Sequence, residues 1–139
     1  MTAEEREGTL PVRSEQDIVA SRQKVRALCQ ALKLSLVDQT KMITAASELS
    51  RNTLVHGGGG EMHWELVDDG IRRGLKLTFS DQGPGIADHK LALTDGWTSG
   101  GGMGLGLPGS RRLVHDFDLQ SAPGAGFRVE ILIPQPEVA

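Results

Sequence analysis

Two polar side chains suited to proton transfer and metal binding lie one helical turn apart near the middle of the chain. Glu48 and Asn52 are four residues apart in a stretch with helical periodicity, so both are expected on one face, beside the apolar stripe. A carboxylate can accept a proton there, and an amide oxygen can bind a magnesium ion that holds phosphates. A solvated helix face is the alternative interpretation of the same pattern.

A second signal is an acid followed by a tight glycine turn, Asp81-Gln-Gly83-Pro-Gly85. A hydrophobic strand is expected to end at Asp81, whose carboxylate can accept a hydrogen bond from an exocyclic amine. Gly83 and Gly85 lack a Cβ, so a flat ring can lie against their backbone. The pattern predicts the floor of a nucleotide pocket. An ordinary turn, in which Asp81 accepts a bond from its own backbone, is the alternative.

A third signal is the glycine cluster from Gly100 to Gly106, which leads into a helix expected to start near Leu105. Unpaired N–H groups and the positive end of the helix dipole meet there and favour phosphate binding. A flexible loop is the alternative. No strand precedes the literal GxGxxG of this region, which argues against a dinucleotide-binding βαβ unit, and no lysine follows as a Walker loop requires.

Helices and strands are expected in mixed order around these residues. Ser14 and Ser35 are expected to cap two helices, the first ending near Lys33 and the second before the glycines at 57–60. Strands are predicted at 9–13, 62–67, 75–79, 118–122 and 127–133, and further helices at 88–93 and 105–117. The pattern predicts a single α+β domain over 1–139, a two-layer α/β sandwich with a mixed, mostly antiparallel sheet covered by helices on one face.

Hydrophobic spacing along the two long helices predicts which side chains are buried. The expected core positions are Ile18, Val25, Leu28 and Leu32 in the first helix and Met42, Ala45, Ala46, Leu49 and Thr53 in the second.

Composition excludes several classes of protein. The chain has 139 residues and a net charge of −3, so no broad basic field favours nucleic acid or an anionic membrane. The chain contains no run of eighteen apolar residues, so no membrane-spanning helix is predicted. Cys29 is the single cysteine and cannot form an internal disulfide, so a buried thiol and a cytoplasmic location are expected. The histidines at 56, 63, 89 and 115 have no HExxH or cysteine-pair spacing, which gives a zinc site little support.

The three signals occur in an order that resembles the GHKL (Bergerat-fold) ATPase superfamily. Within it, the chain is similar to the RsbT-type serine/threonine kinases of the anti-sigma regulatory factor family. The resemblance covers nearly the whole chain. It rests on Asp17-Ile-Val-Ala-Ser-Arg22, Glu48-Leu-Ser-Arg-Asn52, Asp81-Gln-Gly-Pro-Gly85-Ile86 and Ser99-Gly-Gly-Gly-Met-Gly104-Leu-Gly106-Leu-Pro-Gly109.

The resemblance implies ATP and Mg²⁺ as cofactors and a role for each motif. Glu48 would be the general base, Asn52 the Mg²⁺ ligand and Asp81 the acceptor for the adenine amine. The residues implied around the nucleotide are Gly83, Gly85 and Ile86 on the adenine side and Gly102, Met103, Gly104, Leu105 and Gly106 at the phosphates.

Two features modify these expectations. The family usually carries a threonine after the glycines that precede the last strand, where this chain has Phe127, so a hydroxyl near the adenine is missing. From Leu91 to Leu107 there is no lysine or arginine, so the expected lid brings no cation to the γ-phosphate. Because arginine fingers contribute roughly 10³ to 10⁵ in rate, slow intrinsic turnover is predicted unless a partner or Arg51 supplies charge.

The function implied by the resemblance is phosphorylation of a STAS-domain scaffold or antagonist protein, RsbS- or RsbR-like, in a stress-signalling complex. Once released, such a kinase would bind and activate a downstream phosphatase or another output module. Two alternatives stay open: an anti-sigma factor kinase that binds a sigma factor directly, and a nucleotide-gated binding switch without catalysis.

Overall fold

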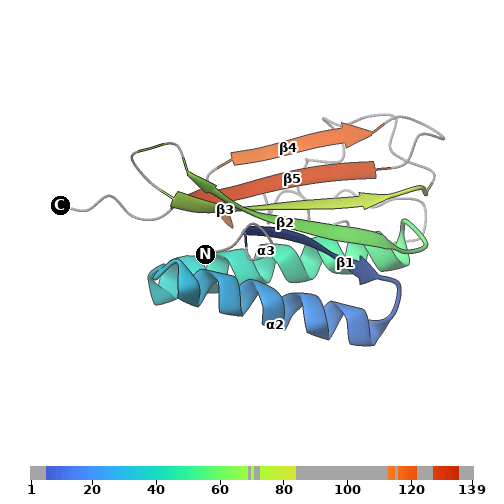
Figure 1. The fold of residues 1–139 in the computed structure, drawn as a ribbon. Helices are drawn as coiled ribbons and strands as arrows, with labels where there is room; N and C mark the ends of the chain where they lie inside the picture. Colours follow the sequence, from blue (N-terminus) through green and yellow to red (C-terminus); the bar gives the residue numbers. More distant parts are fainter. Residues whose placement is uncertain are drawn as a thin grey trace.

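Two helices cover one face of a five-stranded sheet in the computed structural model, which describes residues 6–68, 70, 73–83, 113–114, 116–121 and 127–134. Helices α2 and α3 lie side by side beneath the sheet in Figure 1. The elements in chain order are β1 (Glu7–Val12), α2 (Glu15–Ala31), α3 (Leu36–Val55), β2 (Gly60–Asp68), β3 (Arg73–Asp81), β4 (Asp116–Ser121) and β5 (Phe127–Pro134). The predicted two-layer sandwich is confirmed.

The strand order in the sheet is β1-β2-β3-β5-β4, and all four neighbouring pairs are antiparallel. Both predicted hairpin pairs, β2–β3 and β4–β5, are present. β1 is an edge strand, and it contains Pro11 opposite Glu61 of β2. Pro11 has no N–H to donate, and on an edge strand its ring can lie on the side that has no partner strand, so no hydrogen bond between strands is lost. The edge position predicted from the sequence is confirmed.

Helix α2 begins where the sequence predicts it. The Ser14 side chain accepts a hydrogen bond from the Asp17 N–H at 3.1 Å. The helix ends at Ala31, after which Lys33 takes a positive φ of 56° and the Leu34 N–H donates to the Cys29 carbonyl at 3.1 Å. This reversal turns the chain back into α3.

Helix α3 repeats the same cap and ends beside the sheet. Its cap, Ser35, accepts from the Asp38 N–H at 3.1 Å. At the other end the Asn52 carbonyl accepts from the N–H groups of both His56 and Gly57, at 3.0 and 3.1 Å. The chain then turns through Gly58 and Gly59, both at positive φ, directly into β2.

The core lies between the helix layer and the sheet. All nine predicted helical core positions are buried. Alternation along β3 directs Leu75, Leu77 and Phe79 toward the helices. Cys29 is also buried, as predicted, and burial together with the Asp38 carboxylate raises the pKa of its thiol to about 12. It therefore acts as a packing group.

The prediction of a helix extending to Phe117 is wrong at its end. Phe117 belongs to β4, where it lies opposite Ile131 of β5 and packs against the core. The spacing of apolar residues before β4 suits a helix locally, but pairing with β5 determines the conformation. The predicted helix at 88–93 and the segment 105–112 lie outside the described residues.

Helices that could cross a membrane are absent from the described part of the chain, where none is both long and apolar enough.

Candidate nucleotide site

Asp81 is the last residue of β3 and lies on the helix-covered side of the sheet, with only 6% of its surface exposed. Its neighbours in the sheet are Gly60 of β2 and Phe127 of β5. The Gly83 N–H donates to Asp81 Oδ1 at 2.8 Å. The second oxygen, Oδ2, accepts no hydrogen bond from the residues that the structure describes. It therefore keeps its capacity to accept a donor.

The electrostatics of Asp81 follow from its position. Burial raises the pKa of its carboxyl above the ordinary value of 3.8, while the hydrogen bond from Gly83 acts in the opposite direction. The turn considered as the alternative interpretation of this motif is thus present. A turn at the surface would leave the carboxylate hydrated, whereas this turn holds the Asp81 carboxylate in the interior. A buried acceptor discriminates strongly between ligands that carry a hydrogen-bond donor and ligands that lack one.

Gly57 explains how closely the chain can approach Asp81. A Cβ added at Gly57 would collide with the Asp81 carboxyl group, and one added at Gly83 would lie 2.8 Å from the Gly57 Cα. The end of α3, the end of β3 and the turn after β3 therefore meet at backbone contact. From the sequence, Gly57 was interpreted only as the residue that ends the second helix, and its contact with Asp81 was not predicted.

Asn52 lies at this same end of α3. It is 8% exposed, so the prediction that it lies beside the apolar stripe is wrong. Its carbonyl holds Gly57, and Gly57 packs against Asp81, which brings the ends of the two motifs together. The turn that follows is bonded to the same end of α3, because the Gly59 N–H donates to the Thr53 carbonyl at 2.9 Å.

Glu48, one helical turn before Asn52, is exposed and has no hydrogen bond or ion pair with another described residue. Glu48 and Asn52 are four residues apart and therefore on the same side of α3, but Glu48 is exposed whereas Asn52 is buried. The structure thus places one member of the pair in the interior and the other at the surface.

A cavity of about 400 Å³ opens beside Asp81. This volume is within the range of small-molecule sites. Its lining comprises Arg13, Gly57, Gly58, Gly59, Gly60, Glu61, Ser80, Asp81 and Gln82. Arg13, which follows β1 and lies close to Gly59, was not among the predicted site residues. Its cation is the one basic group in the described lining, and no local motif marks it.

Arg51 was considered as a source of charge for the site. In the structure its guanidinium forms a two-point pair with the Glu15 carboxylate, at 3.2 and 3.3 Å. The pair joins α3 to the first turn of α2 and neutralises the cation locally. Both side chains are exposed.

The remaining predicted site residues lie outside the described part of the chain. They are Gly85, Ile86, Gly102, Met103, Gly104, Leu105 and Gly106.

Comparison with known proteins identifies the family. Residues 37–137 match the family described as histidine kinase-, DNA gyrase B-, and HSP90-like ATPase. The chain belongs to this GHKL family. It is 41% identical over 121 residues to the serine/threonine-protein kinase RsbT of Bacillus subtilis, across 87% of this chain and 91% of that protein. Within the GHKL family it is therefore a member of the RsbT-type serine/threonine kinases.

Two solved structures have the same fold. The RsbU and RsbW domains of Rv1364c from Mycobacterium tuberculosis match 94% of this chain with a TM-score of 0.61 and 16% identity, and the match covers 33% of that longer chain. The catalytic domain of histidine kinase ThkA matches 92% of this chain and 96% of its own, with a TM-score of 0.50 and 16% identity.

Membership of the GHKL family implies ATP as the ligand, and the described residues fit this ligand. Asp81 offers a buried acceptor whose Oδ2 accepts no hydrogen bond from the described residues, and it borders the cavity. The absence of a Cβ at Gly57 and Gly83 lets the backbone pack against the Asp81 carboxyl and hold it in place. Asn52 supplies an amide at the same end of α3. An amide oxygen such as that of Asn52 is a ligand type that Mg²⁺ accepts.

Proposed function

We propose that the chain is a single GHKL domain over 1–139 that acts as a Mg-ATP-dependent serine/threonine-protein kinase on a STAS-domain scaffold or antagonist protein. The observation that carries the proposal is the buried carboxylate of Asp81, packed against Gly57, whose N–H donates to the Asn52 carbonyl. An interior acceptor of this kind, in a chain of the RsbT type, suits a purine amine.

Asp81 and the glycines around it select the base in this proposal. Oδ2 of Asp81 accepts the adenine amine, and Oδ1 stays bonded to the Gly83 N–H. Because Oδ1 is already held, the carboxylate is oriented before the nucleotide enters, and less conformational entropy is lost on binding.

Asn52 and Glu48 divide the remaining roles on α3. The amide oxygen of Asn52 would hold Mg²⁺, whose chemistry is to neutralise charge on the β- and γ-phosphates. Glu48 is exposed, so the hydroxyl of a protein substrate can reach it, and its carboxylate takes the proton from that hydroxyl. The buried position of Asn52 suits a ligand of the cofactor, and the exposed position of Glu48 suits a base that acts on a protein substrate.

The residues outside the described part complete the proposed site. Gly85 and Ile86 would adjoin the adenine, and the cluster Gly102, Met103, Gly104, Leu105 and Gly106 would bind the phosphates through backbone N–H groups. We place the protein in the cytoplasm, because its one thiol is buried and unpaired, as in reducing compartments.

The partners follow from the RsbT relationship. We propose RsbS- or RsbR-like STAS proteins as substrates and a downstream phosphatase or output module as the target of the released kinase. The described sheet face and helices carry charges of both signs and no extensive basic field, in keeping with a protein partner.

Transfer of labelled phosphate from ATP to a STAS protein tests the kinase proposal. We expect Glu48→Gln to keep the ATP affinity of the wild type and to lose transfer by roughly 10² to 10⁴, the usual contribution of a general base. Glu61→Gln, at an acid that lines the cavity but carries no proposed chemical role, is the matched control. Transfer by Glu48→Gln at the wild-type rate would refute the role of Glu48.

A nucleotide-gated switch without catalysis is the second candidate. Pairing of the Arg51 guanidinium with Glu15 favours it, because no basic residue lies between Leu91 and Leu107 to replace that charge. A switch would bind the STAS protein differently with ATP and ADP, and the wild type would transfer no label. Pull-down with this protein from a cell extract that contains sigma factors tests the anti-sigma alternative. Capture of a sigma factor would favour that alternative, and capture of a STAS protein would favour the kinase proposal.

A further inference from the structure

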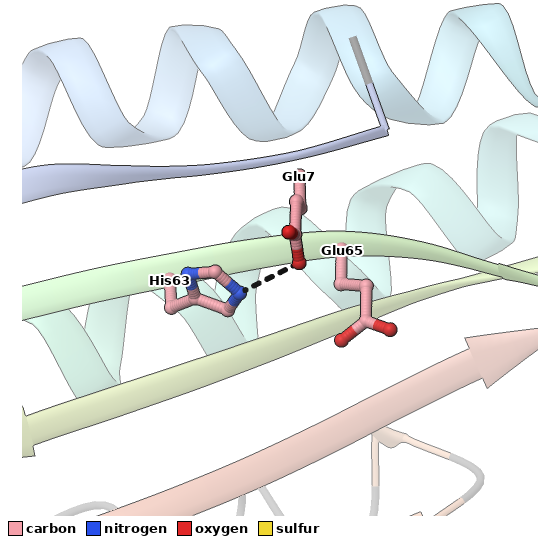
Figure 2. A group of neighbouring side chains, drawn as sticks. All are labelled: Glu7, His63 and Glu65. Carbon is pink, nitrogen blue, oxygen red and sulfur yellow. Dashed lines mark ion pairs between the residues drawn. The ribbon is translucent and has the colours of Figure 1, made fainter. Parts of the chain in front are cut away.

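Three metal-ligating side chains lie together on the face of the sheet that the helices leave open. Figure 2 shows Glu7 of β1 with His63 and Glu65 of β2. The β1–β2 register places Glu7 directly opposite Glu65 and Thr9 opposite His63. His63 Nε2 is 3.6 Å from Glu7 Oε2, and one donor atom from each of the three residues lies within 4.8 Å of the others.

His63 is oriented by a residue outside this group. Thr9 Oγ1 lies 2.9 Å from His63 Nδ1. When Nδ1 carries the proton and donates to Thr9, the lone pair of Nε2 is directed to the side of Glu7. Metal-binding histidines are commonly held in this way, by a hydrogen bond from the ring nitrogen that does not bind the metal.

The charges around the group favour a cation. Two carboxylates directly opposite one another on neighbouring strands repel. Lys76 lies opposite Glu65 on β3, but its Nζ pairs with Glu130 at 3.4 Å. Glu65 itself has no ion pair with any residue that the structure describes. A divalent cation would offset this repulsion.

We propose that Glu7, His63 and Glu65 bind a zinc-class divalent ion, with a water in the fourth position. Zn²⁺ accepts imidazole nitrogen and carboxylate oxygen at about 2.0–2.2 Å, so two ligands in a tetrahedral site are about 3.3–3.6 Å apart. The observed 3.6 Å between Nε2 and Oε2 requires little adjustment. The imidazole favours this class over Mg²⁺.

This site is separate from the nucleotide site and does not depend on the proposed kinase activity. Asp81 faces the helices, whereas the three ligands lie on the opposite face. The ion would join the edge strand β1 to β2 through side chains, in addition to the backbone ladder. Local spacing in the sequence does not reveal this site, because its ligands are brought together by the β1–β2 register and not by an HExxH motif.

Calorimetric titration of the untagged chain with zinc chloride tests the proposal. We expect one ion per chain, and we expect His63→Gln and Glu7→Gln each to weaken zinc binding by at least about tenfold. His56→Gln and Glu61→Gln are the matched controls and should bind as the wild type does. Absence of zinc binding to the wild type, or unchanged binding by His63→Gln, would overturn the proposal.

Thr9 provides a test of the orienting hydrogen bond. Thr9→Val keeps the shape of the side chain but removes the hydroxyl, and we expect zinc binding to weaken roughly tenfold. Thr9→Ser should restore the wild-type affinity, because it restores the hydroxyl to Nδ1. Equal affinities for the three proteins would show that Thr9 does not position His63.

Discussion

The two faces of the sheet treat acidic side chains in opposite ways. Asp81, on the covered face, is 6% exposed and has its pKa raised by burial. Glu130, on the open face, lies between Lys76 at 3.4 Å and Arg128 at 3.1 Å, with 26% of its side chain exposed. The first carboxylate is kept in the interior at a cost to folding, and the second gains modestly from its neighbours. A buried carboxylate of this kind is consistent with the proposed binding role of Asp81.

Asp81→Asn gives the largest expected effect and separates binding from stability. Loss of a charged acceptor is worth about 1.5–3 kcal/mol, so ATP affinity should fall at least about tenfold in calorimetry. The free protein should become more stable to heat, because a buried charge is removed while the amide oxygen still accepts from Gly83.

The pH dependence of this variant follows from the raised pKa of Asp81. Between the ordinary value of 3.8 and the folded value, the folded state binds more protons than the unfolded state, so the wild type loses stability as pH rises. The stability advantage of Asp81→Asn should therefore grow from acidic to neutral pH. A variant less stable than the wild type at neutral pH would contradict this account.

Gly57→Ala tests whether close packing at Asp81 matters for binding. The new Cβ would meet the Asp81 carboxyl, so we expect a loss of about 1–3 kcal/mol in unfolding free energy and weaker ATP binding. Gly8→Ala is the matched control, because its Cβ would approach the Trp64 ring to 2.8 Å, away from the site. Equal ATP affinities of the two variants would show that Gly57 serves stability alone.

Glu130→Gln probes the open face and has the smallest expected effect. Exposed ion pairs contribute about 0.2–1 kcal/mol, and salt screens them. Urea unfolding at low salt should show a loss within that range, reduced at high salt. A loss as large as that of Gly57→Ala would remove the contrast between the two faces.

Local signals predicted the helices well. Ser14 and Ser35 act on N–H groups three residues away, and both caps are present in the structure. The buried helix positions were also predicted, because a helix repeats every 3.6 residues and one apolar stripe covers the core. The strand that ends at Asp81 followed from its apolar alternation.

Long-range contacts account for what the sequence did not reveal. Phe117 joins β4 because Ile131 of β5 pairs with it. The spacing of apolar residues along α3 likewise did not reveal the burial of Asn52. The contact of Gly57 with Asp81 joins two elements that are far apart in the sequence. The roles of Glu48, Asn52 and the phosphate glycines stay predictions.

The β1 edge of the sheet disfavours pairing with another chain. A strand of a second chain that paired with β1 would form hydrogen bonds with the backbone N–H groups of β1, and Pro11 has no N–H to donate. Glu7 adds a negative charge on the same strand. This edge is therefore a poor template for the addition of a further strand.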